Sequence, residues 1–266
     1  MLCVVMLNGV PADHSDLAAQ LTPAWLARAA AGLQKQLREH VAPAWPYAQG
    51  AVVRVGAGAD DVADAETPCF IVANLDDPNA EAYHADEGNG QPDEYMGLDT
   101  VATLDDVTSA IGHENDEVCG DPECDQWVTV PSGIALPNGL TPGMQIAREV
   151  CDPIQDRTYP IDLGDGGAPI IVPDFVLPAY FDLTITGPTS YGEAACGLPR
   201  LEPFNRTSGG YQLARNADGS GETQVFGYMP PHRRMKARHH SSRTYRRGLR
   251  VGPSTPPRTS TPPQGG

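Results

Sequence analysis

This sequence has no long apolar run, no second close pair of cysteines and, after residue 230, no acidic residue. No stretch approaches the roughly 18 apolar residues that a membrane helix requires, so we expect no contact with a membrane interior. The apolar opening at residues 2–7 lacks the basic start of a signal peptide and is too short to be one. This opening segment therefore predicts a buried first strand. Without a signal peptide, we expect the protein to be made in a cytoplasm.

The six cysteines are sparse for a chain of 266 residues. A zinc knuckle needs two close pairs, and only Cys119 and Cys124 lie close together in the sequence. These two enclose a short turn and could be bridged in an oxidising setting. Buried free thiols are the alternative.

Charge is divided unevenly along the chain. Residues 1–230, the acidic body, hold all 34 Asp and Glu but only 9 of the 18 Lys and Arg, a net charge of −25, whereas residues 231–266, the basic arm, carry +9. The body should repel nucleic acid and anionic membranes. The Pro-rich arm is expected to be extended. It is either a solubilising or linker tail, or it contacts an acidic protein surface, with nucleic acid as the weaker alternative. Its contact residues are Arg233, Arg234, Lys236, Arg238, Arg243, Arg246, Arg247 and Arg250.

One helix combines clear boundaries with a metal-type motif. Thr103 and Asp106 form a capping-box pattern and Gly120 is a stop signal, so the sequence predicts a helix over residues 104–119. His113 and Glu117 are four residues apart and lie on one face. The motif HExxE differs by one residue from the HExxH of zinc peptidases, in which two His ligands flank a Glu that acts as general base.

The remaining pattern predicts an α+β fold. Thr22 and Pro23 open a second amphipathic helix that ends at Pro43. Short β-type runs at 2–7, 51–55, 68–73, 81–85 and 94–100 precede the motif helix. Residues 125–230 are rich in Pro and Gly and predict an irregular and β part, with β-type runs at 126–130, 169–172, 175–177 and 180–185. We therefore divide the chain at residues 1–124, 125–230 and 231–266.

This order of elements resembles the N-terminal half of a zincin metallopeptidase, in which a twisted mixed sheet carries the metal-binding helix and an antiparallel edge strand borders the cleft. The chain also resembles a family of uncharacterised proteins of tailed phages and bacteria over most of residues 22–212. The matching segments are AAAGLQKQLREHVAPAW (29–45), AYHADEGNGQP (82–92), SAIGHENDEVCGDP (109–122), AREVCD (147–152), VPDFVLPAYF (172–181), expected to be extended, and GGYQL (209–213).

The zincin resemblance implies one zinc or other divalent ion and a third ligand downstream of the helix. Glu149 is the first choice for that ligand and Asp152 the second, although Asp152 could equally be a turn residue before Pro153. In this arrangement Glu114 is the general base, and Tyr83 or His84 on the edge strand stabilises the oxyanion. His84 could instead be a metal ligand, or a hydrogen-bonded residue without a role in the site.

Two functions follow from the resemblance. The phage relatives carry a helix closer to SHExLExLxDP, and Asn115 and Asp116 depart from it with polar residues. We therefore expect a virion-associated structural or accessory protein with a degenerate or structural metal site. Its arm would bind capsid, head or tail components or neighbouring copies. The alternative is an active zinc-dependent metallopeptidase with a peptide substrate.

Overall fold

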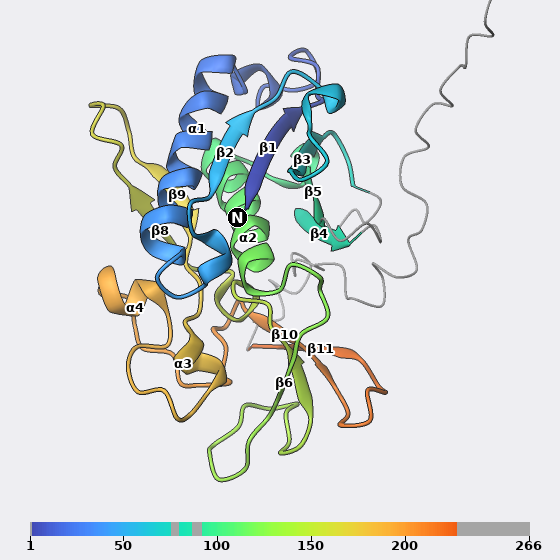
Figure 1. Ribbon diagram of the computed structural model, residues 1–266, viewed down its shortest axis with the longest axis vertical. Coiled ribbons are helices and arrows are strands. Elements are labelled where there is room, and N and C mark those ends of the chain that lie inside the picture. The colour runs from blue at the N-terminus through green and yellow to red at the C-terminus, as the bar shows by residue number, and fades with distance from the viewer. Residues whose placement is uncertain (1, 76–79, 87–91, 228–266) are drawn as a thin grey trace, which may run out of the picture.

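The structure is a computed structural model that describes residues 2–75, 80–86 and 92–227 (Figure 1). The basic arm, with the contact residues predicted between Arg233 and Arg250, lies outside the described residues. Within the described residues, no helix has the length and apolar character of a membrane span.

The larger sheet is mixed, and its strand order is β2-β1-β3-β5-β4. β2, β1, β3 and β5 run parallel to one another, whereas the edge strand β4 runs antiparallel to β5. Successive side chains of β1 point to opposite faces of the sheet, so Val4 and Met6 share a face and Val5 lies on the other. Val4 and Met6 join the core that also contains side chains of both main helices. The five strands are β1 (Cys3–Asn8), β2 (Val52–Val55), β3 (Thr67–Val72), β4 (Ala82–Asp86) and β5 (Pro92–Gly97).

The first main helix begins as predicted but changes character before its end. The hydroxyl of Thr22 accepts a hydrogen bond from the backbone N–H of Trp25, and Pro23 occupies the first turn of α1 (Pro23–Lys35). A π-helical segment, η2 (Gln36–Val41), follows directly. Leu37 and Val41 remain fully buried in this segment, and the wider turn directs Gln36 into the interior.

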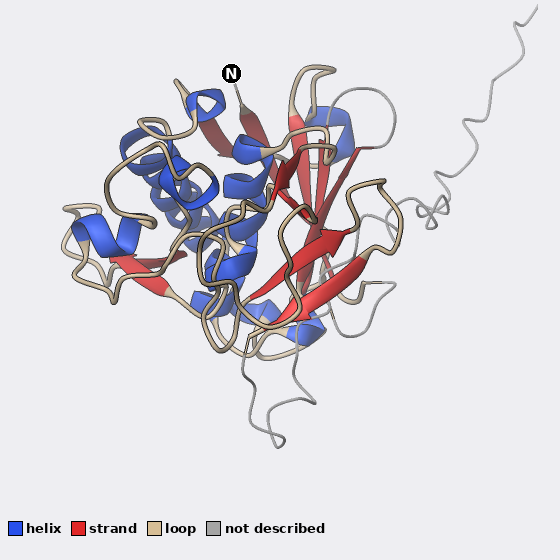
Figure 2. Cartoon of the chain, turned by 90° about the horizontal axis from the view of Figure 1, so that it is seen from below, coloured by secondary structure: helices blue, strands red, loops and turns tan. Residues whose placement is uncertain are grey.

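The second main helix, α2 (Leu104–Gly120), confirms the prediction for the motif helix. Thr103 and Asp106 form the expected capping box. The helix packs against β4, β5 and the later strand β9, and it also contacts α1. Figure 2 shows the helices gathered beside the strands of the larger sheet. Every residue of α2 from Val107 to Gly120 is buried, so the HExxE segment lies inside the protein.

The second part contains more regular structure than its composition predicts. An antiparallel sheet has the order β11-β10-β7-β6, and β8 pairs with β9. Three predictions were wrong here. PAYF forms the short helix α3 (Pro178–Phe181) instead of an extended segment, residues 175–177 form only an isolated bridge at Val176, and residues 180–185 form no strand. The other elements are β6 (Trp127–Thr129), β7 (Gln145–Ala147), β8 (Thr158–Ile161), β9 (Ile170–Pro173), α4 (Tyr191–Ala195), β10 (Tyr211–Arg215) and β11 (Thr223–Phe226).

These elements confirm an α+β fold with mixed and antiparallel sheets and two main helices. The hydrophobic core includes residues from both sides of position 124. Cys119 and Cys124 are not joined by a disulfide, so the bridge considered from the sequence is absent in the part of the chain that the structure describes.

Candidate metal centre

Three separate segments bring ionisable side chains together around one turn of α2. The helix supplies His113, Glu114 and Glu117, the edge strand β4 supplies His84, and the 3₁₀ helix η6 (Asp152–Ile154) supplies Asp152. All five side chains are at most 3 % exposed. They form two groups of three possible metal ligands, and Glu117 belongs to both.

The first group consists of His113, Glu117 and Asp152. Nε2 of His113 lies 3.1 Å from Oε1 of Glu117 and 3.1 Å from Oδ1 of Asp152. Ligand atoms about 2.0–2.2 Å from a tetrahedral zinc ion are separated by roughly 3.3 Å, so both distances from Nε2 of His113 are close to this spacing. All three ligand atoms lie within 4.8 Å of one another. The backbone N–H of Asp152 also lies 3.3 Å from Oε1 of Glu117 and donates a hydrogen bond to it.

The second group consists of His84, Glu114 and Glu117. Nδ1 of His84 lies 2.9 Å from Oε2 of Glu114 and 3.8 Å from Oε2 of Glu117. The two oxygens of Glu117 therefore face different groups: Oε1 faces His113 and Oε2 faces His84.

Burial and mutual repulsion shift the proton equilibria of this cluster. Burial and the charge of Asp152 raise the pKa of Glu117 to about 8. Burial alone would lower the pKa of His113, but the charge of Glu117 and the hydrogen bond to Asp152 raise it well above the ordinary value. Without a metal ion, the cluster therefore retains protons at neutral pH.

The donor set fits a divalent cation. Among the described residues, Glu114, Glu117 and Asp152 form ion pairs with the imidazoles of His84 and His113. Buried charges need a compensating charge, and imidazole nitrogen with carboxylate oxygen suits zinc and related ions. His113, Glu117 and Asp152 are the residues that would hold such an ion.

Two of the residues predicted for the site belong to neither ligand group. Glu149 is buried, and its charge contributes to the raised pKa of Tyr211. The chain turns at η6, and Asp152 is the residue that lies against His113. Tyr83 alternates with His84 along β4 and lies on the opposite face of the sheet, where its ring stacks on Tyr95 at 5.0 Å.

Tyr211 is a site residue that sequence reasoning missed. It begins β10 and is buried, and its phenol forms a hydrogen bond with Asp152. Burial, together with the charges of Asp152 and Glu117, raises the pKa of Tyr211 well above its ordinary value, so the phenol stays protonated as a donor. A Cβ on Gly210 would lie 2.0 Å from the carbonyl oxygen of Pro153, which explains the small residue beside Tyr211.

The two polar residues that follow Glu114 also lie in the interior. Asp116 is fully buried, and its Oδ2 accepts a hydrogen bond of 2.8 Å from Nε2 of Gln36 in η2. Burial raises the pKa of Asp116 well above its ordinary value. Asn115 is fully buried, and neither atom of its amide has a hydrogen-bond partner among the described residues. Neither residue belongs to the two ligand groups.

Comparisons with known proteins give no relative for this arrangement. No protein-family model, curated protein or solved structure matches the chain. The chemistry of the centre therefore rests on its own geometry.

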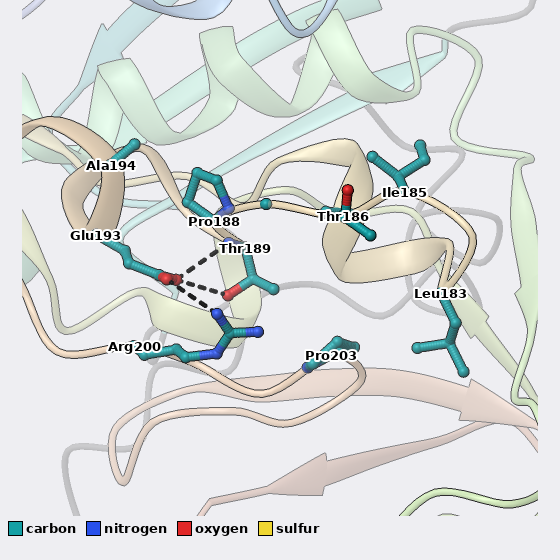
Figure 3. Close-up of a pocket in the computed structure, with 11 residues that line it drawn as sticks. Leu183, Ile185, Thr186, Pro188, Thr189, Glu193, Ala194, Arg200 and Pro203 are labelled. Atoms are coloured by element: carbon teal, nitrogen blue, oxygen red, sulfur yellow. Dashed lines mark hydrogen bonds and ion pairs between the residues drawn. The ribbon is translucent and has the colours of Figure 1, made fainter.

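A surface cavity of about 610 Å³ lies in the second part, away from these groups. Figure 3 shows Leu183 and Ile185 on one side of it and the pair Glu193 and Arg200 on the other. Nη1 of Arg200 lies 3.5 Å from Oε1 of Glu193. Neither of the two ligand groups contributes to its lining, so this cavity is not part of the candidate metal centre.

Proposed function

We propose that this protein is a metal-dependent hydrolase of the zincin type that cleaves peptide bonds. The observation that carries the proposal is the meeting of His113, Glu117 and Asp152 with Glu114 beside them. These residues come from the HExxE helix and from the downstream AREVCD segment. The order of the larger sheet and its antiparallel edge strand β4 also agree with the arrangement that the zincin resemblance implies.

Each side chain has a role that its position supports. A zinc ion held by His113, Glu117 and Asp152 would polarise a carbonyl group and increase the acidity of water. Glu114 accepts the proton of the attacking water and transfers it to the leaving amine. His84 Nδ1, 2.9 Å from Glu114 Oε2, orients this carboxylate, and the protonated phenol of Tyr211 donates its hydrogen bond to Asp152 and orients that ligand.

The zincin resemblance also implies a peptide substrate, because in that arrangement the antiparallel edge strand borders the substrate cleft. Among the described residues, β4 is the outer strand of the larger sheet and runs antiparallel to β5. It carries His84 to Glu114.

The test compares the zinc-loaded full chain with Glu114→Gln on an unstructured protein such as casein. We expect the variant to retain its zinc and to lose activity by about 10²–10⁴-fold, because the amide cannot accept the proton. Equal cleavage by both proteins would contradict the assignment of Glu114. No cleavage by the wild-type chain with one zinc bound would contradict the hydrolase function.

A second candidate is the virion accessory protein, in which the metal site is structural. Its support is the burial of the ligands, because structural zinc sites are closed whereas catalytic sites keep an open position. An ion between Glu117 and Asp152 would join α2 to η6, and the basic arm would anchor the protein to capsid or tail components. Removing residues 231–266 should then abolish association of the protein with the virion. Glu114→Gln should leave this association unchanged. Association of the truncated chain with unchanged affinity would contradict anchoring.

A further inference from the structure

One buried carboxylate near the centre has no role in the proposed hydrolysis. Glu94 lies in β5, directly opposite His84 of β4, and is fully buried. Residues that oppose each other in an antiparallel pair share a face of the sheet, so Glu94 faces the same side as His84. Among the described residues, neither carboxylate oxygen of Glu94 accepts a regular hydrogen bond, and only the thiol of Cys69, a weak donor, lies against it.

The residues around Glu94 form a strongly acidic interior. The carboxylate of Glu114 raises the pKa of Glu94, adding to the larger effect of burial. The proposed ion at His113 and Asp152 occupies the Oε1 side of Glu117, and the Oε2 side faces His84. His84, Glu114 and Glu117 therefore surround a second position, and Glu94 lies close enough for the charge of Glu114 to act on it.

We propose that a second divalent cation of the zinc type binds at His84, Glu114 and Glu117, with Glu94 beside it, and inhibits the hydrolase by occupying its base. The ligand atoms are Nδ1 of His84 and Oε2 of both Glu114 and Glu117, all within 4.8 Å of one another. Glu117 then binds one ion through each oxygen. The inhibitory role rests on the proposed function, because it requires Glu114 to be the proton acceptor.

The two positions should fill in sequence. His84 and Glu117 are separated by 3.8 Å at their ligand atoms, compared with 3.1 Å in the first group. A second ion is also repelled by the first. The second ion therefore binds more weakly, and Glu114 is free to accept a proton when one equivalent of zinc is present.

The test is a zinc titration of the full chain after removal of metal with a chelator, followed by calorimetry and by metal analysis of the desalted protein. We expect two equivalents for the wild type and one for His84→Gln. Glu94→Gln, which preserves side-chain shape, should also lose or weaken only the second equivalent. His14→Gln is the matched control, because His14 pairs with Asp99 at a partly exposed position, and it should bind two equivalents.

The outcomes separate this inference from the proposed function. Saturation of the wild type at one equivalent, or two equivalents in His84→Gln, would overturn the second site. If that single equivalent is lost in His113→Gln, the hydrolytic metal remains supported. No zinc bound by the wild type would overturn both proposals. Hydrolysis that stays constant while the second equivalent binds would overturn the inhibitory role.

Discussion

Removal of metal should make the stability of this protein fall as the pH rises. In the metal-free chain the pKa of Glu117 is raised from 4.5 to about 8. Between these values the carboxyl is protonated in the folded chain and ionised in the unfolded chain. The folded state therefore binds more protons, and its stability is fully present below about pH 4.5 and is lost as the pH rises through about 8.

The size of the effect follows from one proton. Between pH 5.5 and 7.5, Glu117 alone should reduce the free energy of unfolding by roughly 2.5 kcal/mol. The raised pKa of His113 acts in the same direction. As the pH rises, the imidazole of His113 stays protonated in the folded chain after it has lost its proton in the unfolded chain. For a protein of this size the melting temperature should fall by about 5–10 °C. Bound zinc should remove this trend, since metal ligands must be deprotonated.

Urea unfolding of the full chain in excess EDTA at several pH values measures the effect. The control is Glu117→Gln, which removes this proton and should reduce the pH slope by about 1.4 kcal/mol per pH unit. Metal-free wild-type protein whose stability is constant or increases between pH 5.5 and 7.5 would refute the reasoning.

Two further substitutions test the packing around the centre. Gly112→Ala should destabilise the protein by about 1–3 kcal/mol in urea unfolding, because the added Cβ would lie 2.7 Å from Cδ of Pro173. Gly58→Ala is its control, with no atom within 4 Å, and an equal effect of both would contradict the packing argument. Gln36→Leu should cost about 1–3 kcal/mol by removing the hydrogen bond to buried Asp116. A change below about 0.5 kcal/mol would show that this bond contributes little.

The sequence predicted the elements whose boundaries depend on local chemistry. The capping box of Thr103 and Asp106 defined the start of α2, and Thr22 with Pro23 defined the start of α1. The π-helical turn after Lys35 was missed because Leu37 and Val41 remain buried in it, so the apolar pattern continues unchanged. Whether such a segment is α-helical or π-helical depends on its packing against distant parts of the chain.

The ligand spacing within α2 was also readable from the sequence, but the contributions of other segments were not. The choice between Glu149 and Asp152 depends on the turn at η6, which packs against β10. Tyr211 had one signal, the adjacent Gly210, whose lack of a side chain permits this close approach. The pairing of His84 with Glu114 depends on where β4 lies over α2, which no local pattern specifies.

The central claim is that His113, Glu117 and Asp152 hold a metal ion. X-ray absorption at the zinc edge, on full chain loaded with one equivalent, tests it most directly. The account predicts only nitrogen and oxygen ligands at about 2.0–2.2 Å, with one imidazole that disappears in His113→Gln. Sulfur ligands at about 2.3 Å, or an unchanged spectrum in that variant, would contradict it.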